Sequence, residues 1–198
     1  MTIANQAKIE IVEEKVLSNG WTKLSTFDVA YTSSKGHTDR LKREIYHRTP
    51  AAAVFLYDPT RDIVVLVRQF RLPVYLHEKP GFTLEAPAGL LDEDAPEEAI
   101  RREVLEETGY RARDVRFLFR VYSSPGAVTE TIHLFAALVE PSDRVAAGGG
   151  LADEHEDIEV VEMSLREALD MIDSGEIIDA KTIILLQWAM LNRDRLCS

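Results

Sequence analysis

Two closely spaced apolar runs restrict the fold of this chain more than any other feature. Residues 51–57 read AAAVFLY and residues 63–70 read IVVLVRQF, with the polar segment DPTRD between them. A polar segment with proline and aspartate is typical of a turn. Nearly continuous runs of β-branched and aromatic residues are typical of strands that are buried on both faces. The two runs therefore predict strands at the centre of a sheet.

The segments that follow predict helices on both faces of that sheet. Further strand patterns occupy residues 83–89, 115–123, 131–140 and 158–164, and helix patterns follow Asp94, Ser164 and Asp179. Residues 73–82, PVYLHEKPGF, predict a loop. Strands interspersed with helices in this way indicate an α/β fold in which a mixed sheet is sandwiched between helices.

Residues 8–48 predict a small antiparallel β unit that precedes the main body. Two runs of alternating apolar and polar residues flank Ser18-Asn19-Gly20, and Asn-Gly between such runs is a strong hairpin signal. A third strand pattern covers residues 41–48. We therefore expect an N-terminal β unit over residues 1–48 and a main domain over residues 49–198.

Composition and charge restrict the partners of this 198-residue chain. Its formal net charge of −11 argues against general nucleic-acid binding, which needs a basic surface. No apolar stretch approaches the roughly 18 residues that a membrane span requires. The first residues lack the pattern of a secretory signal, and the single cysteine, Cys197, gives no disulfide framework. We therefore expect a cytoplasmic protein that binds neither nucleic acid nor membrane.

The stretch from Gly89 to Tyr110 contains eight carboxylates, and helix geometry divides them into two groups. Glu98, Arg102 and Glu106 are four residues apart and predict an exposed charge ladder. Glu103 and Glu107 share a different face with Ala99 and Ile100. Asp94 is predicted to cap this helix together with Glu97, and Gly109 to end it.

A solvated acidic face is the ordinary interpretation of such a helix, but the inward placement of Glu103 and Glu107 favours a metal site. An uncompensated pair of carboxylates on the protein-facing side is costly. Divalent cations such as Mg²⁺ or Mn²⁺ take oxygen ligands and leave water positions open to phosphate oxygens. The helix therefore predicts a site where metal ions bridge carboxylates and a phosphate ligand.

The end of this helix resembles the Nudix box. Residues 102–110, REVLEETGY, match the pattern R-E-U-x-E-E-x-G-U, although the gap from Gly89 to Glu103 is one residue shorter than usual and Asp94 takes the place of an early glutamate. Six further segments resemble the branch of the Nudix hydrolases that acts on GDP-mannose: KREIYHR, VRQFR, EAPAGLLD, SSPGAVTE, AGGGLADEHEDIEV and SGEIIDAKT. The resemblance extends over nearly the whole chain.

This resemblance implies the Nudix fold and Mg²⁺-dependent hydrolysis of the pyrophosphate bond of a nucleoside diphosphate sugar, with Mn²⁺ as an alternative metal. It implies GDP-mannose as the substrate and GMP and mannose 1-phosphate as products. The implied metal ligands are the Ala88 carbonyl, Glu103, Glu107 and Glu156, with Glu106 bound through water. A homodimer supported by the N-terminal unit is also implied.

The resemblance further implies a set of substrate-binding residues: Trp21, Lys42, Arg43, Glu44, Arg71, Ala88, Gly89, Glu130 and Lys181. A carboxylate must act as general base on a metal-activated water. Glu130 is favoured for this role over the loop acids Glu154 and Glu156. The catalytic set is thus Glu103, Glu107 and Glu130.

Several alternatives stay open at this stage. Arg68 and Arg71 could pair with acids at the sheet edge, Trp21 could pack in a dimer interface, and Glu130 could be an exposed glutamate at the start of a strand. An ADP-ribose pyrophosphatase uses similar metals on a similar scaffold. A non-catalytic Nudix-like nucleotide sensor is a further alternative, although the intact box argues against it.

Overall fold

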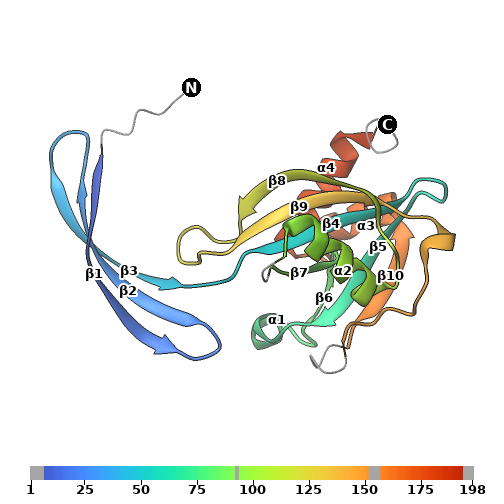
Figure 1. The fold of residues 1–198 in the computed structure, drawn as a ribbon, viewed down its shortest axis with the longest axis horizontal. Coiled ribbons are helices and arrows are strands. Elements are labelled where there is room, and N and C mark those ends of the chain that lie inside the picture. Colours follow the sequence, from blue (N-terminus) through green and yellow to red (C-terminus); the bar gives the residue numbers. More distant parts are fainter. Residues whose placement is uncertain (1–6, 92–93, 152–156, 194–198) are drawn as a thin grey trace. The chain divides into compact units, whose positions relative to one another are not determined.

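The computed structural model describes residues 7–91, 94–151 and 157–193 and divides the chain into two compact units (Figure 1). The first unit comprises Met1–Thr49 with Tyr122–Glu130, and the second comprises Pro50–Val121 with Thr131–Ser198. Within the described residues, no helix is long and apolar enough to cross a membrane.

The first unit is a three-stranded antiparallel sheet in the order β1-β2-β3. Its strands are β1 (Lys8–Asn19), β2 (Lys23–Thr32) and β3 (Thr38–Tyr46). Asn19 pairs with Lys23, so the predicted hairpin around Asn19-Gly20 is confirmed. The segment 122–130 joins this unit through a parallel bridge between Tyr46 and Val128.

The second unit contains the predicted mixed sheet, which has seven strands. Its main path runs β10-β5-β4-β9-β8, with β6 paired to β5 and β7 paired to β4. The strands are β4 (Ala51–Asp58), β5 (Ile63–Phe70), β6 (Phe82–Glu85), β7 (Ala88–Leu90), β8 (Arg113–Tyr122), β9 (Thr131–Leu138) and β10 (Glu159–Ser164). β4 pairs antiparallel with β5 and parallel with β9, which makes the sheet mixed.

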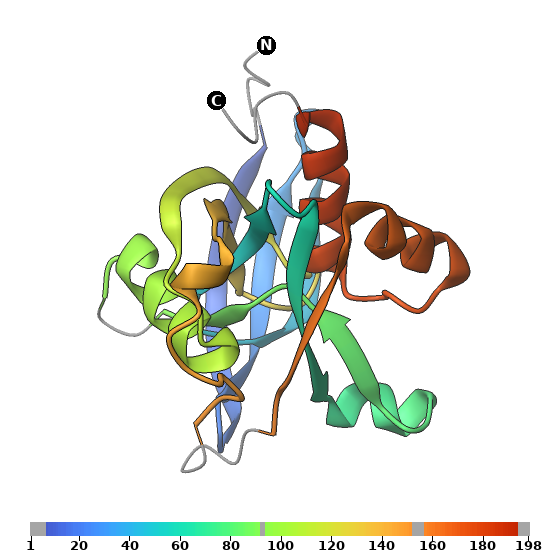
Figure 2. The ribbon, with the colours of Figure 1, turned by 90° about the vertical axis from the view of Figure 1, so that its right-hand side faces the viewer.

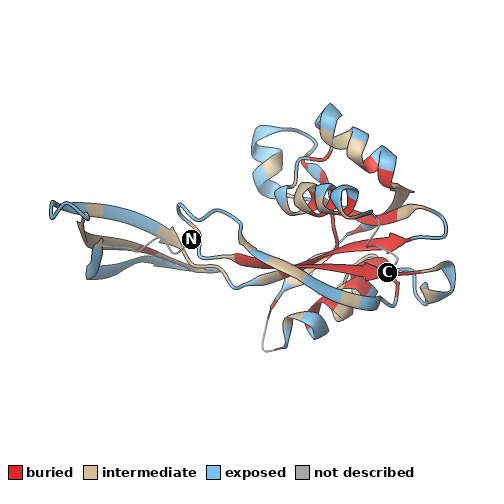
Figure 3. Cartoon of the chain, turned by 90° about the horizontal axis from the view of Figure 1, so that it is seen from above, coloured by how far each residue is buried: buried red, intermediate tan, exposed pale blue. Residues whose placement is uncertain are grey.

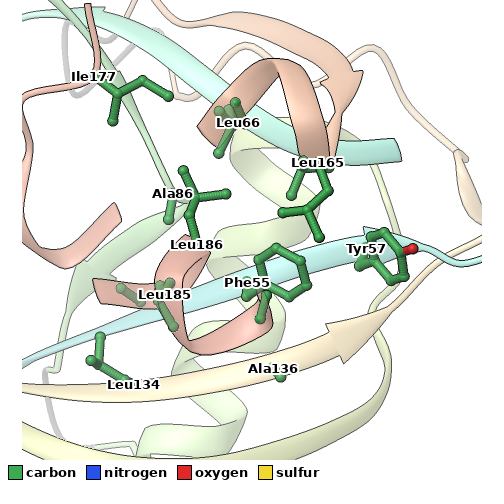
Figure 4. Close-up of a cluster of buried hydrophobic side chains, with 14 of the residues drawn as sticks. Phe55, Tyr57, Leu66, Ala86, Leu134, Ala136, Leu165, Ile177, Leu185 and Leu186 are labelled. Atoms are coloured by element: carbon green, nitrogen blue, oxygen red, sulfur yellow. The ribbon is translucent and has the colours of Figure 1, made fainter. Parts of the chain in front are cut away.

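Alternate residues of β4 enter two separate hydrophobic cores, one on each face of the sheet. Phe55 and Tyr57 pack on one face with Leu165 of α3 (Leu165–Ser174) and with Leu185 of α4 (Ala180–Leu191), as Figure 4 shows. Val54 and Leu56 pack on the other face.

That second core is completed by helix α2 (Pro96–Thr108), whose Ala99, Ile100 and Val104 are buried. The sheet therefore lies between α2 on one side and α3 with α4 on the other (Figure 2). Buried residues concentrate along its central strands, as the apolar runs predict (Figure 3).

The start of α2 differs from the sequence-based prediction. Ala95 is the N-cap residue and makes no side-chain cap, while Pro96 lies in the first turn. The prediction that Asp94 caps the helix is therefore wrong. Proline is favoured here because its fixed φ suits a helix and its missing N–H has no helical partner in the first turn. The Asp94 carboxylate instead accepts a hydrogen bond from Arg102.

The other helix boundaries mostly follow the predictions. Gly109 ends α2 in the left-handed conformation, with φ of 75°. Ser164 and Glu167 form the predicted capping box of α3, and Asp179 caps α4 by accepting from the Thr182 N–H. One α-helix and one short 3-10 helix, η1 (Pro141–Asp143), were not predicted. The α-helix, α1 (Leu72–His77), occupies part of the expected loop and buries no residue. Six residues are too few to show helical periodicity, so only Pro73 signals it.

Candidate active site

The predicted carboxylate pair of α2 lies against the short strand β7. The Ala88 N–H donates a hydrogen bond to Oε2 of Glu107 at 3.0 Å. A Cβ atom at Gly89 would lie only 2.1 Å from Cδ of Glu103. Glycine at this position therefore leaves the space that the Glu103 side chain occupies. Both carboxylates are thus held beside the same two backbone residues.

Burial confirms that Glu103 and Glu107 face the protein. Glu107 is 2% exposed, and its helix neighbours Ala99 and Ile100 are buried as well. The Glu103 side chain is 19% exposed, and its Oε1 lies 3.6 Å from Nη2 of Arg102. Burying a carboxylate is costly unless other groups compensate its charge. The pair therefore indicates a site that attracts positive charge.

The glycine-rich loop begins against the end of α2. The N–H groups of Gly149 and Gly150 donate to the carbonyl oxygens of Glu107 and Glu106, at 2.8 and 3.1 Å. These bonds satisfy carbonyls that a helix end leaves without helical partners. The loop acids Glu154 and Glu156, predicted as general-base candidates and, for Glu156, as a metal ligand, lie outside the described residues.

A second group of charges surrounds Glu85, at the end of β6. Arg71 donates from Nε and Nη2 to the two oxygens of Glu85, each at 2.8 Å. Lys181 donates to Oε2 at 2.5 Å, and the Thr83 hydroxyl donates to Oε1 at 2.6 Å. Lys181 also lies 3.1 Å from Asp179. The predicted substrate residues Arg71 and Lys181 are thus brought together by a carboxylate that was not among the predicted site residues.

Electrostatics connect this group to α2. Burial alone would raise the pKa of Glu85, but the hydrogen bonds and charges of Arg71 and Lys181 lower it to about 2. The hydrogen bond to Glu85 raises the pKa of Arg71, and the nearby charges of Glu107 and Asp179 raise it further. Arg71 therefore lies within electrostatic reach of both Glu85 and the α2 carboxylate.

The remaining predicted substrate residues belong to the first unit. Lys42, Arg43 and Glu44 lie exposed on β3. Trp21 is 81% exposed, and the Arg48 guanidinium lies 4.4 Å from its ring centroid. Nε of Arg48 also lies 3.4 Å from Glu130. That these residues meet the α2 carboxylates stays a prediction.

Arg68 pairs with an acid of the neighbouring strand, which is the alternative to a role in substrate binding. Its Nη1 lies 3.1 Å from Glu159 across the pair of strands β5 and β10, and its guanidinium lies 5.0 Å from the Phe82 ring centroid. Arg68 thus forms an ordinary cross-strand ion pair with Glu159. Arg71, three residues later, is hydrogen-bonded to Glu85 instead.

The described residues fit part of a divalent-metal site. Among them, no three histidine, cysteine, aspartate or glutamate side chains cluster closely enough to hold a metal ion. Glu103 and Glu107 nevertheless supply oxygen donors, which hard divalent cations prefer. Because Gly89 has no Cβ atom, the Glu103 carboxylate can lie against the β7 backbone. The donor chemistry therefore agrees with a divalent metal ion, and the predicted ligand Glu156 lies outside the described residues.

Comparisons with known proteins identify the family. The NUDIX domain model matches residues 47–186, which is more than half of the chain. This chain belongs to the Nudix family. Nudix hydrolases generally use divalent metal ions, in agreement with the acidic pair on α2. A second model, the GDP-mannose pyrophosphatase NudK N-terminal domain, matches residues 8–46 of this Nudix hydrolase.

Relatives named GDP-mannose pyrophosphatase resemble this Nudix hydrolase over most of their length. The protein from Cronobacter sakazakii is 45% identical over 92% of this chain and 95% of its own. The protein from Citrobacter koseri is 46% identical over 91% and 94%, and one from Escherichia coli O1:K1 is 44% identical over 93% and 96%. A solved structure, an ADP compounds hydrolase, has a TM-score of 0.71 at 20% identity and covers 93% of this chain and 96% of its own, which supports the fold.

The low pKa of Glu85 predicts how the stability of this Nudix hydrolase changes with acid. In the unfolded chain Glu85 takes up a proton near its usual pKa of 4.5, whereas the folded chain resists protonation down to about 2. The stabilisation is therefore complete above about pH 5 and is lost as the pH falls toward 2, by about 3 kcal/mol in total.

Urea denaturation of the wild-type protein and of Glu85→Gln, at pH 6 and at pH 3, measures this loss. We expect the variant to be less stable at pH 6 and to lose less stability between the two pH values. Equal losses in the two proteins would show that Glu85 does not contribute to the acid sensitivity.

Proposed function

We propose that this Nudix hydrolase cleaves the pyrophosphate bond of GDP-mannose and releases GMP and mannose 1-phosphate. The observation that carries the proposal is the pair Glu103 and Glu107, intact on α2 and held against Ala88 and Gly89 of β7. Identities of 44–46% to proteins named GDP-mannose pyrophosphatase support the choice of substrate. The match of residues 8–46 to the NudK N-terminal domain supports it further.

We propose Mg²⁺ as the metal, with Mn²⁺ as a substitute. Its ligands would be the Ala88 carbonyl, Glu103, Glu107 and Glu156, with Glu106 acting through water. When bound, the metal would neutralise phosphate oxygens and make a bound water more acidic. The burial of Glu107 and its hydrogen bond to Ala88 fix one ligand on a rigid helix, which suits this role.

The protein's own groups would orient the substrate and move the proton. Arg71 presents a partly exposed guanidinium to the phosphates, and Lys181 adds positive charge behind it. Trp21, Lys42, Arg43 and Glu44 of the first unit would bind the nucleoside and the sugar. Glu130 would accept the proton of the attacking water as general base. Nε of Arg48 lies 3.4 Å from Oε1 of Glu130 and would help to orient that carboxylate.

The two alternatives are less well supported. The resemblance to an ADP compounds hydrolase, at 20% identity, supports the fold and not the substrate. A non-catalytic sensor would not need an intact carboxylate pair that is buried at an energetic cost. The first alternative predicts different products and the second predicts none, so product analysis separates both from our proposal.

We also propose a homodimer that forms through the first unit. β1 is an edge strand of its sheet, and it exposes a series of large apolar side chains: Ile9, Ile11, Val12, Val16 and Leu17. Exposed apolar groups on a long edge strand favour association with another chain. A second copy of the same chain would cover them.

Product analysis tests the reaction. The protein is incubated with Mg²⁺ and separately with GDP-mannose, ADP-ribose and other nucleoside diphosphate sugars, and the products are identified by mass spectrometry. We expect GMP and mannose 1-phosphate from GDP-mannose, and no turnover by Glu107→Gln. AMP and ribose 5-phosphate as the main products would support the first alternative, and the absence of turnover would support a sensor.

The variant Gly89→Ala tests whether the position of Glu103 matters. The added methyl group displaces the Glu103 side chain, and misplacing a reacting group by about 1 Å can slow catalysis by about a hundredfold. The end of a flexible side chain moves at little cost, so we expect an unchanged thermal midpoint but a much lower kcat/KM. Gly126→Ala is the matched control, because no atom lies within 4 Å of its added Cβ. Equal activity in the two variants would contradict the role of Glu103.

Light scattering after size-exclusion chromatography tests the dimer. We expect a mass twice the 22.3 kDa of the chain. Ile11, 64% exposed on β1, is replaced by glutamate to disfavour the apolar interface, and Ser18→Glu on the same strand is the charge-matched control. A wild-type monomer with full activity would contradict both the dimer and its contribution to the substrate pocket.

A further inference from the structure

Glu85 is a buried carboxylate to which the proposed reaction gives no role. Its side chain is 4% exposed, and it lies at the end of β6, three residues before Ala88. Four hydrogen bonds reach it, two from Arg71 and one each from Lys181 and Thr83. A carboxylate has about four acceptor positions, so Glu85 is well satisfied without any ligand. Its hydrogen-bonding capacity is therefore used by Arg71, Lys181 and Thr83.

The contact with Arg71 fixes the plane of the guanidinium. Nε bonds to one carboxylate oxygen and Nη2 bonds to the other, each at 2.8 Å. Such a bidentate pair is rigid because the planar fork of arginine matches the two oxygens of a carboxylate. A single hydrogen bond would leave the long side chain free to rotate. Glu85 thus orders Arg71 before any substrate arrives.

Arg71 keeps donors for an anion. A guanidinium carries five N–H donors, and two of them are used by Glu85. The side chain is 43% exposed even though one edge of it contacts a buried acid. Its charge interacts with Glu107 on α2. An ordered, partly exposed guanidinium near the proposed metal ligands is suited to bind a phosphate.

Lys181 is placed differently. Its side chain is 11% exposed, and Nζ contacts both Glu85 and Asp179. An ammonium group has three donors, of which two are directed at these carboxylates. Two acids and two bases therefore balance their charges in this group. Lys181 neutralises the buried acids, whereas part of the Arg71 guanidinium stays accessible to a ligand.

We infer that Glu85 is a positioning residue, which holds Arg71 in the orientation that binds the pyrophosphate group of the substrate, with Lys181 as its counter-ion. The inference rests on the proposed function, since it assigns Arg71 to the phosphates of that substrate. Glu85 acts only through Arg71, so removing Arg71 makes Glu85 irrelevant to substrate binding.

A double-mutant cycle tests this dependence. The steady-state kinetics of the wild-type protein, Glu85→Gln, Arg71→Ala and the double variant are measured with the best substrate among the nucleoside diphosphate sugars. We expect each single variant to raise KM about tenfold, with a smaller effect on kcat. The double variant should match Arg71→Ala within about threefold, because coupled residues are not additive. Independent, multiplicative effects of the two substitutions would overturn the inference.

Arginine NMR signals provide a readout that does not depend on turnover. The Nε–H signal of Arg71, assigned by its loss in Arg71→Ala, should exchange slowly in the wild-type protein and rapidly in Glu85→Gln. Slow exchange in both proteins would show that Glu85 does not hold Arg71. If Glu85→Gln does not fold, Thr83→Val removes one hydrogen bond to Glu85 and should produce the same changes to a smaller degree; unchanged KM and exchange in Thr83→Val would overturn the inference.

The matched control is Asp58→Asn, which weakens another buried carboxylate–arginine pair. Asp58 is fully buried and lies 2.5 Å from Nε of Arg61, but it takes no part in the proposed site. We expect Asp58→Asn to lower the thermal midpoint and leave KM unchanged. An equal rise in KM would mean that Glu85 matters only for stability, which contradicts positioning.

Failure of the proposed function gives a different result. A wild-type protein that hydrolyses no nucleoside diphosphate sugar contradicts the function. Calorimetry then measures the affinity for inorganic pyrophosphate of the same four proteins, namely the wild type, the two single variants and the double variant. Weaker binding in both single variants with no further loss in the double variant would support the role of Glu85, and additive losses would overturn it.

Discussion

The burial of β4 on both faces is the constraint on which the second unit depends. Side chains of alternating residues enter opposite cores, so helices must cover the strand on both sides. The same strand pairs with β7, where Ala52 faces Gly89 and Ala53 faces Ala88 in the register. Because α2 packs on this strand as well, the register of β4 determines how the helix carboxylates meet the β7 backbone. The fold and the candidate site thus share one element.

Charge compensation explains why so many acids can lie in the interior. Glu85 is neutralised by Arg71 and Lys181, and Asp58 by Arg61. These pairs involve arginine forks and several hydrogen bonds, which offset the cost of burial. Glu107 accepts a hydrogen bond from the Ala88 N–H and interacts electrostatically with Arg71. Buried acids in the described part of this protein are therefore stabilised by nearby bases at Glu85 and Asp58, whereas a metal-binding role for Glu107 stays a proposal.

The sequence predicted what local patterns determine. Helical spacing placed Glu103 and Glu107 on the inner face, and the apolar runs predicted the central strands. The Asp94 cap was wrong because Pro96 begins the helix two residues later. Glu85 was missed because its partners, Arg71 and Lys181, are 14 and 96 residues away along the chain. Glu85 begins the segment EAPAGLLD, which resembles the family, but no local rule indicates that this glutamate meets two distant bases.

The balanced charges around Arg71 affect how a polyanionic substrate reaches this protein. The chain carries a net charge of −11, and the group around Glu85 contains as many acids as bases. It therefore creates no long-range field that attracts phosphates. At longer range, the net negative charge of the chain disfavours the approach of a polyanion. Dissolved salt screens charges that are more than about 10 Å apart, so moderate ionic strength weakens this long-range repulsion more than it weakens the contacts that Arg71 makes at close range.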